Sequence, residues 1–317
     1  MAERLRQIAS DSGLDLVGFA SAEAFEDYRW QDSFMRNPKL TLADAQSILV
    51  VGVNELKFLK EPEVREPAGH VARSYAAGHE YNLVDGLIPL KRFLQARGHK
   101  ALISPGSIAE STIPLKLAAV RAGLGWQGKH SVVITPEFGS WVSFGALLTD
   151  ASLDCDQPVI NKHCGDCRLC IDSCPMGAIK APYVVDMSIC LDEILNSRGC
   201  IPNDIKDKVG HRILSCDTCL EVCPHSLKIL KKTALTGKGP YRFSLLKLLN
   251  LEEQQFKSLF GRLGWSIDFV HFKRNVIVAL GNSADRSSIR ILEGYRGDES
   301  DVLRDAVEWA LVKLKNL

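Results

Sequence analysis

Residues 1–153 alternate between short apolar runs and segments whose apolar residues recur every three or four positions. The recurring pattern predicts amphipathic helices over residues 3–12, 79–97 and 113–124. The continuous runs predict strands over residues 14–20, 47–53, 100–104, 131–135 and 141–148. The run 47–53 is rich in β-branched residues, as expected for a strand that is buried on both faces. Strands that alternate with helices indicate an α/β domain over residues 1–153.

The hydrophobic pattern is interrupted once within this domain. Residues 55–75 are charged and contain two prolines, which predicts a surface loop. Residues 154–232 are dense in cysteines, prolines and short turns, which predicts a separate domain. Lysines at 228, 231, 232 and 238, with a Gly-Lys-Gly-Pro stretch, predict a solvated basic linker.

The last part of the chain, residues 233–317, has a helical pattern after residue 242. Residues 272–281 and 302–311 are typical of the helices of HEAT-like repeats. Two such helices are too few for a free solenoid, so we expect this α-helical module to pack on the rest of the protein.

Composition narrows the class of protein. The chain has 317 residues, 46% hydrophobic, which is enough for two or three domains with sizeable cores. The net charge of +1 gives no global basic field of the kind that marks many nucleic-acid binders. No signal-peptide core or membrane-length apolar run is present, so we expect no membrane contact. Ten cysteines with cluster spacing predict a reducing, cytoplasmic setting.

The cysteines carry the clearest chemistry. Cys164, Cys167, Cys170 and Cys174 follow the C-x2-C-x2-C-x3-C-P pattern that holds [4Fe–4S] clusters in bacterial ferredoxins. A second run, Cys216, Cys219 and Cys223, is one thiolate short, and Cys190 can supply the missing ligand.

In proteins with two clusters, the fourth cysteine of each run binds the other cluster. A ferredoxin-like domain with two clusters is therefore predicted. The first cluster takes Cys164, Cys167, Cys170 and Cys223. The second cluster takes Cys174, Cys190, Cys216 and Cys219.

Other uses of the cysteines are less consistent with the spacing. A disulfide framework is typical of short secreted chains. A pair of zinc sites needs neither a third cysteine two residues on nor a proline after each run. A single cluster or zinc remains the alternative. Cys155 and Cys200 fall outside the pattern, and we expect them to be free thiols that pack like small hydrophobic residues.

Segments along nearly the whole chain resemble the epoxyqueuosine reductase family, cobalamin-dependent iron–sulfur enzymes of tRNA modification. These segments are Gly78–Asn82, Ala122–His130, Pro136–Ser140, Thr149–Asp150, both cysteine runs with Cys190, Pro182–Tyr183, Pro202, Gly210, Lys273–Asn275 and Ala279–Gly281. The combination of Ala-Gly-Leu-Gly-Trp with an uneven second cysteine run is much more specific than either motif alone.

The resemblance implies that cobalamin lies between the N-terminal domain and the cluster domain. Electrons would pass from an external donor of the ferredoxin or flavodoxin type, through both clusters, to cobalt. The corrin would carry the organic chemistry while the protein positions it and supplies a proton. The resemblance also makes tRNA a candidate partner. Corrin contacts would fall at Tyr81, Asn82, Val133, Phe144, Asp192, Asn196, Ser197 and Asp217.

The chain departs from the family at the proton donor. Ala109 stands where the family has its Asp, and the neighbouring Glu110 is the candidate replacement. Three alternatives to an epoxyqueuosine reductase therefore stay open. These are a ferredoxin-like electron carrier, a corrinoid reductase or activator that serves another enzyme, and an enzyme similar to reductive dehalogenases.

Overall fold

The computed structural model describes residues 1–25, 37–61, 64, 67–78, 83–104, 113–159, 164–260 and 267–316. It divides into two compact units. Unit 1 comprises Met1–Glu55, Tyr81–Arg168 and Val222–Thr233, and unit 2 comprises Leu56–Glu80, Leu169–Glu221 and Ala234–Leu317. Each unit takes chain from more than one of the three predicted domains, whose boundaries stay a prediction. None of the helices in the described part of the chain combines the length and apolar composition needed to cross a lipid bilayer.

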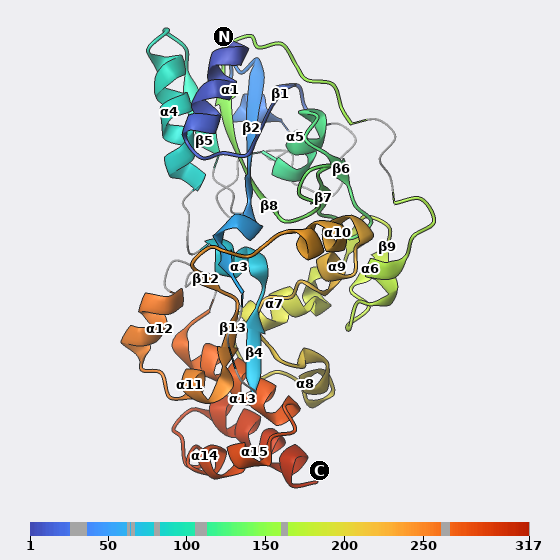
Figure 1. Cartoon of the computed structure of the whole chain (residues 1–317), viewed down its shortest axis with the longest axis vertical. Helices are drawn as coiled ribbons and strands as arrows, with labels where there is room; N and C mark the ends of the chain where they lie inside the picture. The colour runs from blue at the N-terminus through green and yellow to red at the C-terminus, as the bar shows by residue number, and fades with distance from the viewer. Residues whose placement is uncertain are drawn as a thin grey trace. The chain divides into compact units, whose positions relative to one another are not determined.

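Unit 1 is built on a four-stranded sheet in the order β1-β2-β8-β5 (Figure 1). Its strands are β1 (Leu16–Ser21), β2 (Ser47–Asn54), β5 (Ala101–Ser104) and β8 (Val142–Thr149). A hairpin of β6 (Trp126–Gln127) and β7 (Val133–Ile134) follows α5. The helices are α1 (Ala2–Asp11), α4 (Leu83–Gln95), α5 (Leu115–Arg121) and α10 (Pro224–Lys232), with a 3-10 turn at Pro38–Leu40.

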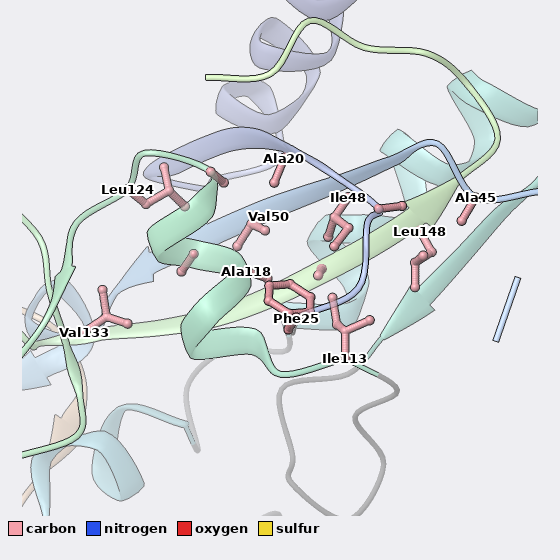
Figure 2. Packing of buried hydrophobic residues seen from close by; sticks show 14 residues of the cluster. Ala20, Phe25, Ala45, Ile48, Val50, Ile113, Ala118, Leu124, Val133 and Leu148 are labelled. Atoms are coloured by element: carbon pink, nitrogen blue, oxygen red, sulfur yellow. The ribbon is translucent and has the colours of Figure 1, made fainter. Parts of the chain in front are cut away.

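Helices cover both faces of this sheet. On one face, Ala118 and Ala119 of α5 pack in a core cluster with Ile48 and Val50 of β2 (Figure 2). On the other face, α4 lies so close to β8 that a Cβ at Gly145 would come within 1.9 Å of Leu83. The predicted burial of β2 on both faces is therefore confirmed.

Every strand pair of this sheet is antiparallel. Alternating strands and helices are more often associated with parallel pairing. Here the central strand β2 lies between β1 and β8, which both run opposite to it, so the helices do not connect parallel neighbours.

Unit 2 contains the small sheet β11-β4-β13 and most of the helices. Its strands are β3 (Leu59–Lys60), β4 (Ala68–Val71), β9 (Ile179–Ala181), β10 (Val184–Val185), β11 (Arg212–Leu214), β12 (Gly239–Pro240) and β13 (Arg242–Ser244). Its helices are α3 (Arg73–Gly78), α6 (Leu169–Asp172), α7 (Leu191–Asn196), α8 (Asn203–Val209), α9 (Thr218–Glu221), α11 (Leu245–Leu249), α12 (Glu253–Phe260), α13 (Phe269–Asn282), α14 (Ile289–Glu293) and α15 (Asp301–Lys315). Short 3-10 helices occur at Met187–Ile189 and Arg286–Ser288, and another, Glu55–Phe58, spans the boundary between the units.

Two predictions about loops were wrong. Part of the predicted loop 55–75 is β4, the central strand of the small sheet, and three of its four residues are buried. Its sequence, Ala-Gly-His-Val, is too short and too mixed to show a strand pattern. The predicted basic linker begins inside α10, which extends to Lys232. The predicted helices in the C-terminal module are present as α13 and α15, which pack on each other, while the HEAT-like repeat type stays a prediction.

Candidate functional site

Three cysteines predicted to bind the first cluster belong to unit 1. Cys164 and Cys167 form a turn in which the Cys167 N–H donates to the Cys164 carbonyl over 2.9 Å. Cys223 is buried at the N-cap of α10 and packs with Trp126 and Ile134. Cys164 packs against the same apolar cluster, so the fold brings the end of the second cysteine run to the start of the first. The remaining predicted ligand, Cys170, is buried in α6 of unit 2.

The position of Cys223 is fixed through α10. The Ser226 hydroxyl accepts a hydrogen bond from the Ser140 N–H (3.0 Å), and its carbonyl accepts one from the Trp141 indole (2.9 Å). The turn that provides these donors contains Gly139 at a φ of +59°, and a Cβ there would lie 2.7 Å from Ser226 Cα. Gly139 is therefore required both for the turn and for the close approach of α10.

The four cysteines predicted to bind the second cluster belong to unit 2. Burial, with smaller contributions from charge on Asp192, Cys216 and Cys174, raises the pKa of the Cys190 thiol to about 11. Burial also raises the pKa of Cys219, with Cys216 and Cys190 adding to the shift. The Cys174 sulfur accepts a hydrogen bond from the Ala178 N–H (3.2 Å). Cys190 therefore lies close to Cys216 and Cys174, and Cys219 lies close to Cys216 and Cys190.

A pKa raised in this way keeps a thiol protonated at neutral pH. Binding of iron requires thiolates, so cluster assembly in this protein must displace protons from the thiols. No group of three His, Cys, Asp or Glu side chains within the described ranges is arranged to hold a single metal ion.

The segments that carry Cys190 and Cys216 are joined by hydrogen bonds. The Ser215 hydroxyl, just before Cys216, donates to the Asp192 carboxylate just after Cys190. The Asn275 amide of α13 donates to the carbonyls of Leu195 and Ile213, each over 2.8 Å. Asn275 is completely buried, so one side chain of the helical module holds both segments together.

Asp217, one of the predicted corrin contacts, is buried within unit 2. Its carboxylate accepts a hydrogen bond from the Arg73 N–H over 2.5 Å, and the Arg73 side chain pairs with Glu221. Burial raises the pKa of Asp217 to about 7, although the Arg73 hydrogen bond and charge oppose the shift. This carboxylate is therefore part of the packing around Cys216.

Two neighbouring predicted corrin contacts, Asn196 and Ser197, lie at the end of α7. The Asn196 amide donates to the Tyr75 hydroxyl (3.1 Å) and the Asp192 carbonyl (2.8 Å), and the Ser197 hydroxyl donates to the Ile194 carbonyl (2.9 Å). The Asn196 Oδ1 is buried, and no group in the described part of the chain donates to it. A buried amide oxygen without a donor fits a ligand that carries N–H groups.

Two of the remaining predicted corrin contacts, Val133 and Phe144, lie in or against the core of unit 1. Val133 is 1% exposed and belongs to the core cluster of unit 1 (Figure 2). Phe144 packs against that cluster. Ordinary core packing accounts for both side chains. Tyr81, Asn82 and Glu110, with Ala109 beside Glu110, lie outside the described residues.

Sequence patterns did not identify several residues that organise these segments. Arg73 and Tyr75 lie within residues 55–75, which the charge pattern assigned to a surface loop. Arg274 is buried in α13, and its guanidinium donates to the carbonyls of Ser197 and Gly199. The sequence analysis used Lys273–Asn275 only as a segment of the family resemblance, and the role of Arg274 and Asn275 as buried polar residues that need partners became clear from the structure.

Comparison with known proteins supports the cluster prediction. Residues 163–226 match the model of the 4Fe-4S double cluster binding domain. An epoxyqueuosine reductase from Bacillus anthracis is 32% identical over 337 aligned residues, which cover 95% of this chain and 86% of the relative.

The chain belongs to the epoxyqueuosine reductase family. It is accordingly an oxidoreductase with a double-cluster domain. A solved epoxyqueuosine reductase with an epoxyqueuosine-modified tRNA-Tyr stem loop matches at a TM-score of 0.86 and 26% identity, covering 99% of this chain and 90% of that chain. A structure of the Bacillus subtilis enzyme, described with its catalytic aspartate loop swung out of the active site, matches at 0.85 and 25% identity, with the same coverage.

Proposed function

We propose that this oxidoreductase binds two [4Fe–4S] clusters and cobalamin and reduces an epoxide, with epoxyqueuosine in tRNA as the first substrate to test. The observation that carries the proposal is the convergence of the cysteines, with Cys164 beside Cys223 and Cys190 beside Cys216 and Cys174. Family membership supports the same conclusion. When bound, the clusters would supply single electrons from a ferredoxin or flavodoxin, and cobalamin would supply the reducing metal at the substrate.

The residues of the chain would hold these groups and manage protons. Cys164, Cys167, Cys170 and Cys223 would hold the first cluster, and Cys174, Cys190, Cys216 and Cys219 the second. The Asn196 Oδ1 would accept an N–H from an amide of the corrin, which would satisfy an otherwise unpaired buried oxygen. Removing an epoxide oxygen as water consumes two electrons and two protons, so a proton donor is required.

Metal analysis tests the cofactor assignment directly. We expect about eight irons and about one cobalt per chain after anaerobic reconstitution with iron, sulfide and cobalamin. About eight irons without cobalt would mean that the protein binds both clusters but not cobalamin. Zinc in place of iron would overturn the proposal.

The proton donor can be tested at two adjacent positions. A general acid contributes about 100-fold or more to turnover. If Glu110 is the acid, Glu110→Gln should lower reduction of epoxyqueuosine tRNA by about that factor. If no acid is present, Ala109→Asp should raise turnover by a similar factor, because it restores the family's residue. Single-turnover assays with reduced protein measure both variants, and activity unchanged in Glu110→Gln would remove Glu110 from this role.

A second candidate function follows from Ala109. A protein without the acid could reduce cobalt for another enzyme and act as a corrinoid activator. The cobalamin spectrum and the turnover of epoxyqueuosine tRNA together distinguish the activator from the reductase. A change in the cobalamin spectrum on binding and reduction, without any turnover of epoxyqueuosine tRNA, would favour the activator. Turnover of the tRNA would favour the reductase, and no change in the cobalamin spectrum would favour a simple electron carrier.

A further inference from the structure

The segment Trp126–His130 lies beside the cysteines predicted to bind the first cluster. It begins in β6, which pairs with β7 through Trp126–Ile134 and Gln127–Val133. It continues through a turn in which the Ser131 N–H donates to the Gly128 carbonyl. The backbone of the segment is therefore fixed by unit 1 itself, independently of any bound group.

Lys129 extends from this segment onto the loop between Cys164 and Cys167. Its ammonium group donates to the carbonyl of Gly165 over 2.5 Å and to the carbonyl of Cys167 over 2.9 Å. These two bonds hold the loop that carries two predicted ligands. They also place a full positive charge on that loop.

Trp126 belongs to the apolar cluster that contains Cys223 and against which Cys164 packs. It is 5% exposed and packs with Cys223, and its ring is nearly perpendicular to that of His225 at a centroid distance of 5.0 Å. Its indole Nε1 is buried, and no acceptor for it exists among the residues that the structure describes. A buried N–H without an acceptor is costly, so its presence beside Cys223 and Cys164 indicates an acceptor that binds there.

We propose that Trp126 and Lys129 are positioning residues that set the reduction potential of the first cluster. The inference rests on the proposed function, since it requires that cluster. The acceptor for the indole would be a sulfur of the cluster or of a coordinating thiolate. Hydrogen bonds to sulfur and a nearby positive charge stabilise the more negative, reduced form, so both residues raise the potential.

The experiment is an anaerobic redox titration followed by EPR, with the variants Lys129→Gln, Lys129→Arg and Trp126→Phe. Lys129→Gln removes the charge, and Lys129→Arg keeps the charge and its donors. Trp126→Phe keeps the aromatic packing but removes the N–H. We expect a lower first-cluster potential in Lys129→Gln and Trp126→Phe and a nearly unchanged one in Lys129→Arg. The second cluster, which is predicted in unit 2, is the internal control.

The results separate the inference from the function beneath it. A wild-type protein that assembles no iron–sulfur cluster would overturn the proposed function. Two assembled clusters with an unchanged first-cluster potential in Lys129→Gln and Trp126→Phe would overturn only the inference, as would equal shifts of both clusters. If Lys129→Gln fails to assemble the first cluster, the first-cluster potential of Trp126→Phe tests the inference instead, because this variant retains the packing against Cys223.

Discussion

At the scale of single residues, the site depends on side chains that are buried before any cofactor binds. Cys223 lies at the start of α10 and is nearly inaccessible, yet it contacts the same apolar cluster as Cys164. Cys190 and Cys219 have raised pKa values because burial disfavours their thiolates. The protein therefore holds the Cys190 and Cys219 thiols in the neutral form.

Exchange of single cysteines tests the assignment of ligands. Cys223→Ala should remove the EPR signal of the first cluster and leave that of the second, because Cys223 packs in the same apolar cluster as Cys164. Cys216→Ala is the matched control and should do the reverse. Loss of the second-cluster signal in Cys223→Ala would show that the two runs do not exchange ligands.

His130 predicts a dependence of stability on pH. Burial lowers the pKa of His130 to about 4, and its Nδ1 accepts a hydrogen bond from the Val132 N–H. Well above pH 6.5 the ring is neutral in both the folded and unfolded states, so it has no effect on the free energy of unfolding. As the pH falls from 6.5 towards 4, only the unfolded state binds the proton, and the free energy of unfolding decreases by up to about 3 kcal/mol.

Thermal melts of His130→Asn over this pH range check that prediction. Asparagine does not titrate, and its Oδ1 can accept the same N–H, so the variant should lose part of the acid dependence. His70, whose pKa burial also lowers to about 4, should keep the rest. An acid dependence equal to that of the wild type would contradict the assignment to His130.

At the scale of elements, α13 connects the helical module to the cysteine segments within unit 2. Asn275 donates to Leu195 at the end of α7 and to Ile213 in β11, the elements that flank Cys190 and Cys216. Arg274 beside it binds the carbonyls of Ser197 and Gly199. The helix therefore stabilises the spacing of two predicted ligands as well as its own module.

Asn275→Ala should reduce the iron content of the second cluster as well as the stability of the fold. It leaves two buried carbonyls without donors, which costs about 2–4 kcal/mol in total. The control is Asn282→Ala in the same helix, since Asn282 makes two similar bonds to the carbonyls of Lys206 and Gly210 in and after α8. We expect both variants to melt earlier, but only Asn275→Ala to lose second-cluster iron. Equal iron loss would mean that stability alone sets occupancy.

At the scale of the whole molecule, unit 2 takes its core from distant parts of the chain. It combines Leu56–Glu80, the segment Leu169–Glu221 and the helical module from Ala234 onwards. The small sheet illustrates this, because β4, β11 and β13 come one from each of these parts. The helical module is therefore not an independent addition to the predicted cluster domain.

A fragment of residues 1–232 tests this arrangement. It retains every predicted cysteine ligand but lacks β13 and α13, so we expect it to lose the second cluster and to retain at most about four irons. Iron content per chain measures the outcome. A fragment that kept about eight irons would show that the predicted boundary at residue 232 is a true domain boundary.

The sequence by itself determined what depends on local geometry. The cysteine spacing predicted the double-cluster domain and the exchange of Cys223 to the cluster of Cys164, because both runs follow the ferredoxin ligand pattern. A continuous apolar run predicted β2, and a helical pattern of apolar residues predicted α5 and α13. Tertiary structure alone decided which distant groups meet. The pairs Arg73 with Asp217 and Asn275 with Ile213 join residues far apart in the chain. Such pairs depend on packing across elements, which leaves no periodic trace in the sequence.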